Sequence, residues 1–123
     1  MKLRVAVIYG GRSGEHEISV RSAKAIMAGM DRARYEIFEY FISQEGKWNP
    51  QPIVPEPGAH PEIDVVFPVL HGTFGEDGTV QGLLELADLP YVGAGVLASA
   101  VSMDKEVMKR VCREQMLPVV DYV

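Results

Sequence analysis

The sequence has little of what usually marks secreted, membrane-spanning or nucleic-acid-binding proteins. Its 123 residues contain one cysteine, Cys112, so no disulfide can form within the chain and a reducing cytoplasm is the expected setting. There are 12 Lys and Arg against 17 Asp and Glu, and the net charge of −5 argues against a nucleic-acid partner. No apolar run approaches the roughly 18 residues that a membrane-spanning helix needs.

The first residues, MKLRVAVIYGG, also differ from a secretory signal. Gly10-Gly11-Arg12 interrupts the short apolar segment where the apolar region of a signal would continue. We therefore expect a cytoplasmic protein with no membrane partner. With 47% hydrophobic and 24% charged residues, the composition is that of an ordinary globular protein, and the length suits one domain.

Three apolar segments predict the main strands of a sheet. Residues 3–9 and 64–70 are apolar almost throughout, which is typical of parallel strands buried on both faces. Residues 35–42 are rich in aromatic and β-branched side chains, which favour strands. Shorter strands are expected at residues 89–92 and 118–123, with a short hairpin return around Trp48.

Apolar side chains at helical spacing predict three helices. The first covers residues 18–30, the second begins at Thr79, and the third begins at Val96 with a break near Asp104. The side chains expected to be buried are Val20, Ala23, Met27 and Met30; Val80, Leu83, Leu84 and Ala87; and, after the break, Val107, Met108, Val111 and Cys112.

The alternation of strands and helices predicts an α/β fold. We expect a doubly wound, mainly parallel sheet with helices on both faces, of the Rossmann-like type. Pro68 has no backbone donor, so it is expected at the end of its strand or at an irregularity. The last expected strand, residues 118–123, is followed by no further element, so we expect the sequence to be part of a longer polypeptide.

The first polar loop, GGRSGEHE at residues 10–17, follows the first strand. Its glycines let the backbone turn tightly and approach a ligand, and the helix that follows favours anions at its start. The loop lacks both GxGxxG and GK[ST] spacing, so a dinucleotide site or phosphate loop has only weak support. Glu17 suits the helix dipole, whereas Glu15 is suited equally to capping the helix and to pairing with a ligand amine.

The second polar loop, HGTFGEDG at residues 71–78, follows the strand at 64–70. His71 lies just beyond the carboxyl end of this buried strand, a position suited to ligand contact or proton exchange. The alternative is that His71 only holds the loop by hydrogen bonds. Glu76 and Asp77 are suited to binding a cation or to starting the next helix, and no metal site is expected in this chain.

A third feature is Lys105, which ends the sequence SMDK at an expected helix start. Its ammonium can bind a phosphate group as a point charge. Lys109 and Arg113 follow at i, i+4 spacing, and for these two a solvent-exposed helix face is the simpler interpretation.

Taken together, three segments closely resemble the N-terminal domain of the D-alanine–D-alanine ligases, which are ATP-grasp enzymes of peptidoglycan synthesis. They are GGRSGEHEIS (10–19), LHGTFGEDGTVQG (70–82) and LPYVGAGVLASAVSMDK (89–105). The resemblance covers nearly the whole chain and is weakest over residues 44–62. It implies that residues 1–123 are the substrate-binding domain that precedes the ATP-grasp domains, and that those domains are absent from this sequence.

The resemblance also implies roles for individual residues. Glu15, the expected catalytic residue, would bind the ammonium group of the first D-alanine. Ile18 would lie near the methyl group of that D-alanine, and His71 would line the same subsite. Lys105 would bind a phosphate of ATP. The complete enzyme would use ATP and Mg²⁺ (or Mn²⁺) to form an acylphosphate, which the second D-alanine attacks.

The portion beyond this sequence would supply the metal ligands and most of the nucleotide contacts. This chain alone is therefore expected not to catalyse the ligation. The resemblance also implies a homodimer. The alternative is a non-catalytic module that binds a small molecule or dimerises, and a nucleotide-binding Rossmann domain acting alone is less favoured because the glycine spacing is wrong.

Overall fold

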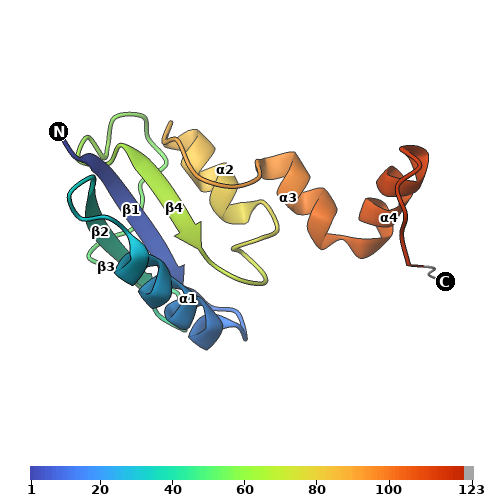
Figure 1. Cartoon of the computed structure of the whole chain (residues 1–123), viewed down its shortest axis with the longest axis horizontal. Helices are drawn as coiled ribbons and strands as arrows, with labels where there is room; N and C mark the ends of the chain where they lie inside the picture. Colours follow the sequence, from blue (N-terminus) through green and yellow to red (C-terminus); the bar gives the residue numbers. More distant parts are fainter. Residues whose placement is uncertain (121–123) are drawn as a thin grey trace.

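The computed structural model describes residues 1–120, and its centre is a four-stranded sheet (Figure 1). In the spatial order of the sheet, the strands are β3 (Trp48–Asn49), β2 (Tyr35–Ile42), β1 (Leu3–Gly10) and β4 (Val65–Val69). β1 is parallel to both β2 and β4, and the short β3 returns antiparallel to β2. The three main strands and the return around Trp48 thus lie where the sequence predicts them.

The helices are α1 (His16–Gly29), α2 (Thr79–Leu86), α3 (Val96–Met103) and α4 (Lys105–Glu114). α1 begins two residues before the predicted start at Ile18. The predicted break near Asp104 is confirmed, because the Asp104 carboxylate accepts a hydrogen bond from Val107 N–H at 3.1 Å and caps α4.

Helices cover both faces of the sheet, as the doubly wound prediction requires. On one face α1 packs against Val5 and Val7 of β1, and on the other α2 packs near Ala6 and Ile8 of the same strand. Successive side chains of a strand point to opposite faces, so the central strand β1 contributes to both cores. The predicted apolar faces of α1 and α2 are buried or half-buried at these two contacts.

The outer side of β4 makes a single bridge, between Val66 and Tyr91. Val66 N–H donates to the Pro90 carbonyl at 2.8 Å, and Val92 N–H donates to the Val66 carbonyl at 2.9 Å. The separate strand predicted here is thus reduced to one bridge. Pro68 lies within β4, two residues after Val66, so its backbone nitrogen faces the same outer side, where the ladder needs no donor.

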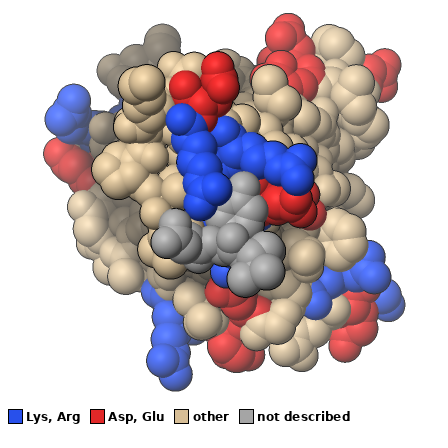
Figure 2. Space-filling model, turned by 90° about the vertical axis from the view of Figure 1, so that its right-hand side faces the viewer, with Lys and Arg blue, Asp and Glu red and all other residues tan. Residues whose placement is uncertain are grey.

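α4 departs most from the sequence prediction. Its apolar residues Val107 and Val111 are 40% and 49% exposed, and no residue of the helix is buried. α3 and α4 extend away from the sheet in Figure 1, and Figure 2 shows this end of the molecule with basic and acidic side chains among uncharged areas. The prediction that Val107, Met108, Val111 and Cys112 are buried is therefore wrong.

The last predicted strand, residues 118–123, lies partly outside the described residues. Residues 118–120 have no regular secondary structure, so the described part of this prediction is wrong.

An ion pair joins the start of β1 to the residue before β4. Asp64 Oδ2 accepts hydrogen bonds from the backbone N–H of Arg4 at 2.8 Å and from its Nε at 3.0 Å. Asp64 Oδ1 accepts a third bond from the guanidinium at 2.8 Å. Hydrogen bonds from the Arg4 side chain, and then from its backbone, lower the pKa of Asp64 to about 2.

Asp64→Asn is expected to reduce the dependence of stability on pH. Because the pKa of Asp64 is depressed in the folded chain, its contribution is fully present above the unfolded value of 3.8 and is lost as pH falls through about 2. Denaturant unfolding at neutral pH and near pH 2 should show a smaller loss for the variant than for the native chain. Glu56→Gln, on an exposed loop, is the control. An unchanged pH dependence in Asp64→Asn would contradict this account.

Ser19 of α1 joins β1 to β4 at their carboxyl ends. Its side chain is fully buried, and its Oγ accepts a hydrogen bond from Gly10 N–H at 2.8 Å. The same hydroxyl donates to the carbonyl of Val69. One side chain therefore satisfies two buried backbone groups at the point where the strands end.

Ser19→Ala is expected to lower the free energy of unfolding by about 1–3 kcal/mol, because two buried backbone groups lose their partner. Ser102→Ala, at an exposed position of α3, should change it by less than about 0.5 kcal/mol. Denaturant unfolding followed by circular dichroism measures both. Equal stability of the two variants would show that the Ser19 hydroxyl is not needed here.

Candidate functional site

Two polar loops meet at the carboxyl ends of β1 and β4. One connects β1 to α1 and the other connects β4 to α2. The Ser13 hydroxyl donates to the carbonyl of His71 at 2.7 Å, and it accepts a hydrogen bond from Glu15 N–H at 3.1 Å. This hydroxyl holds the two sequence motifs side by side, at the edge where open α/β sheets bind ligands.

The first loop begins with a tight turn at Gly10 and Gly11, whose φ angles are +96° and +94°. A Cβ at Gly10 would lie 2.1 Å from the Ile42 carbonyl oxygen, so a larger residue does not fit. Buried His16 fixes the turn, because its Nδ1 lies 2.7 Å from the Gly11 carbonyl. A carbonyl only accepts, so this nitrogen carries the proton. The role of His16 was not predicted from the sequence, because its partner is the backbone carbonyl of Gly11 and no side-chain motif marks this contact.

Glu15 immediately precedes α1, and its side chain is exposed. It makes no capping hydrogen bond to the helix, so the structure does not support the capping interpretation. A Cβ at Gly72 would lie 2.6 Å from Glu15 Oε2, which places the carboxylate directly against the second loop. Within residues 1–120 the carboxylate has no cationic partner, and it is available to a ligand amine.

Ile18 and Ser22 lie on one face of α1, at i and i+4, three and seven residues after Glu15. Ile18 is 52% exposed despite being apolar. Ser22 Oγ lies 3.3 Å from Nε2 of His71, so the half-buried imidazole faces this side of α1. The structure therefore places Glu15 against the loop of His71 and places His71 beside the α1 face that carries Ile18. Ser22 was not predicted from the sequence, because serine within a helix is common.

Glu76 holds His71 from the other side. Its Oε2 accepts a hydrogen bond from Gly72 N–H at 2.9 Å, and its Oε1 lies 3.5 Å from His71 Nδ1. The imidazole thus lies between a hydroxyl and a carboxylate. Ser22 from α1 and Glu76 from the second loop therefore set the orientation of the ring.

Asp77 shapes the second loop. It accepts hydrogen bonds from the N–H groups of Phe74 and Thr79, each at 3.0 Å. Burial raises the pKa of Asp77, but the hydrogen bonds from Phe74 and Thr79 outweigh it, and the pKa lies below its ordinary value. Both acidic residues of the loop are therefore engaged in holding it.

Lys105 is not brought to this site. It is an exposed residue at the start of α4, which lies at the far end of the molecule from α1 in Figure 1. Within residues 1–120, no group of three His, Cys, Asp or Glu side chains is placed to hold a metal ion. In the same described part of the chain, no helix is long and apolar enough to cross a membrane.

Comparison with known proteins identifies the family. Residues 4–62 and 51–94 match the family described as D-ala D-ala ligase N-terminus. The chain belongs to this family. Its two polar loops, which meet through Ser13, both lie within the matched residues.

Known members of the family are longer than this chain. The D-alanine–D-alanine ligase of Solibacter usitatus is 82% identical over all 123 residues, which cover 38% of that protein. The structure of the ligase from Coxiella burnetii superposes with a TM-score of 0.90 at 42% identity, covering 98% of this chain and 43% of that one. The structure of the Bacillus anthracis ligase complexed with ATP superposes with a TM-score of 0.79 at 32% identity. The match covers 100% of this chain and 38% of that one. The chain spans about two fifths of the length of these relatives.

Gly72→Ala is expected to displace the Glu15 carboxylate. Gly72 has φ of +75°, so alanine would cost about 1 kcal/mol of stability, and its Cβ would lie 2.6 Å from Glu15 Oε2. Gly58→Ala is a matched control, because Gly58 has φ of +81° and no atom within 4 Å of an added Cβ. Denaturant unfolding should show a similar loss in both variants. Only Gly72→Ala should shift the carboxyl ¹³C resonance of Glu15, and an unchanged resonance would contradict the contact.

Proposed function

We propose that residues 1–123 are the substrate-binding N-terminal domain of a D-alanine–D-alanine ligase. This enzyme would join two D-alanines to D-alanyl-D-alanine with ATP, for peptidoglycan synthesis. The observation that carries the proposal is that Glu15 lies against Gly72, the residue after His71, at the carboxyl edge of the sheet in a chain of this family. Ile18 is exposed on the same face of α1 as Ser22, whose hydroxyl lies beside His71. The proposed subsite is for the first D-alanine.

The chemistry of the three side chains matches that amino acid. The exposed Glu15 carboxylate would accept charge-assisted hydrogen bonds from the ammonium group. Exposed Ile18, one turn further along α1, offers an apolar surface for the methyl group. His71 would line the subsite, with its ring held by Ser22 and Glu76. We propose Glu15 as the residue that touches the substrate most directly.

The nucleotide and the metal would be bound mostly by other parts of the enzyme. Lys105 is proposed to bind a phosphate of ATP as a point charge. Phosphoryl transfer also needs a metal ion and further cationic groups around the transferred phosphate. Residues 1–120 hold no group of three metal-ligand side chains. We propose that Mg²⁺ or Mn²⁺ would be held by the other parts of the enzyme, and that this chain alone does not catalyse ligation.

The proposal includes a homodimer in the cytoplasm, with no nucleic-acid or membrane partner. Support for association comes from α3 and α4, where Leu97, Val107 and Val111 are exposed. Exposed apolar residues on one end of a molecule favour contact with another protein surface.

Glu15→Gln is expected to lower kcat/KM for the first D-alanine by about 10–100-fold, because an ammonium loses its charged partner. The assay uses a hybrid ligase, in which this chain replaces the matching 123 residues of the Solibacter usitatus enzyme. Glu17→Gln, in the first turn of α1, is the matched control and should leave kcat/KM for the first D-alanine nearly unchanged. The KM for ATP should stay the same in both. An unchanged D-alanine dependence in Glu15→Gln would refute the role given to this carboxylate.

The alternative is a non-catalytic module that binds a small molecule or dimerises, and the exposed apolar residues of α3 and α4 are compatible with dimerisation. The hybrid ligase distinguishes the two proposed functions, because it would form no D-alanyl-D-alanine if this chain were a non-catalytic module. Calorimetry of the 123-residue chain with D-alanine and with ATP, together with its mass in solution, shows which ligand it binds and whether it dimerises. ATP turnover by the isolated chain would contradict its proposed inactivity.

A further inference from the structure

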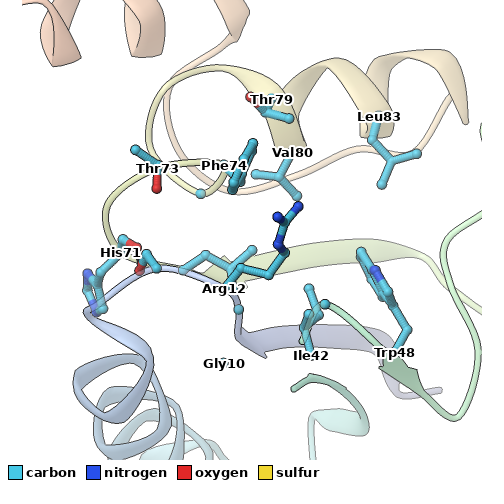
Figure 3. Close-up of a pocket in the computed structure, with 15 residues that line it drawn as sticks. Gly10, Arg12, Ile42, Trp48, His71, Thr73, Phe74, Thr79, Val80 and Leu83 are labelled. Carbon is cyan, nitrogen blue, oxygen red and sulfur yellow. Dashed lines mark hydrogen bonds between the residues drawn. The ribbon is translucent and has the colours of Figure 1, made fainter. Parts of the chain in front are cut away.

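A cavity of about 260 Å³ lies beside the proposed amino-acid subsite and shares His71 with it (Figure 3). It opens between the first loop, the β3 return, the second loop and α2. Glu15, Ile18 and Ser22 do not line it. In Figure 3 the His71 ring lies at one end, beside α1, whereas Trp48 and Leu83 lie at the other. The loop that carries Ser13 thus separates two binding surfaces.

The walls of the cavity away from His71 are mostly apolar. Ile42 and Val80 are buried, and Trp48, Leu70 and Leu83 are half-buried and pack against the core on the α2 face. The volume is slightly below the roughly 300–1,000 Å³ of sites for drug-sized ligands. The cavity therefore suits a molecule smaller than a nucleotide, with an aromatic or branched apolar body.

Arg12 gives the cavity one charged group. Its guanidinium lies 5.1 Å from the centre of the Phe74 ring, and Figure 3 shows the side chain reaching between the two loops toward Val80. Its stem lies against Gly46, where a Cβ would be 2.8 Å from Arg12 Cδ. Within residues 1–120, Arg12 pairs with no carboxylate, so the five N–H donors of its guanidinium are available to an anion.

We propose that this cavity is a second small-molecule site, which binds a small organic acid with an apolar body. The carboxylate would accept hydrogen bonds from Arg12 in the two-pronged geometry that guanidinium favours. The apolar body would lie between Trp48 and Leu83, where it removes apolar surface from water. Arg12 and Glu15 belong to the same loop but serve different ligands, an acid on one side and an amine on the other.

The only tryptophan of the chain, Trp48, lines the cavity and reports its occupancy. Titration of the 123-residue chain with hydrocinnamate, a phenyl ring on a short acid chain, should change the Trp48 emission saturably. The uncharged amide of the same compound is the control ligand. It should bind about tenfold more weakly or worse, because it loses the charge-assisted bond to Arg12. Calorimetry provides a second measurement that does not depend on emission.

Arg12→Gln should weaken hydrocinnamate binding about tenfold and leave the amide unaffected. Arg12 is exposed, so the variant is expected to fold, which circular dichroism checks. Arg21→Gln, an exposed arginine of α1 outside the cavity, is the matched control, and Glu15→Gln should also leave the affinity unchanged. The proposal is overturned if neither emission nor heat shows binding, if acid and amide bind equally, or if Arg12→Gln has no effect. These outcomes are independent of the D-alanine assay.

Discussion

The buried hydroxyl of Ser19 is the interaction on which the rest of the arrangement depends. It bridges Gly10 N–H and the Val69 carbonyl where the two parallel strands stop pairing. Buried backbone groups at a strand end need partners, and two loops that leave the sheet at this point do not provide them. Because Ser19 of α1 satisfies both backbone groups, the two loops can leave the sheet from fixed starting points.

A hydrogen bond also joins the two loops to each other. Ser13 ties the first loop to His71, and His71 is oriented by Ser22 and Glu76. Glu15 is the exception, since its side chain makes no capping bond and lies against a glycine of the second loop. A carboxylate without a protein cation is complementary to a ligand ammonium, because binding does not first break an ion pair.

The first loop also divides the carboxyl edge into two chemically different surfaces. Glu15 faces the α1 side with Ile18 and His71, while Arg12 reaches into the apolar cavity beside Phe74. Only two residues, Ser13 and Gly14, therefore separate a positive group from a negative one on opposite sides of one turn. The second loop forms a wall of both surfaces, since His71 lines the cavity at its rim.

The sequence by itself determined the main strands, the helices and the sheet class, because these follow from local periodicity and from the side-chain types of each segment. It also predicted Glu15, Ile18 and His71 as site residues through motifs that resemble a family, but it did not predict the side chains that contact them. Ser19 finds its partner 50 residues away, a contact that no local pattern encodes. Burial of α4 was predicted wrongly because amphipathic spacing shows which face is apolar, whereas only the tertiary structure decides what lies against it.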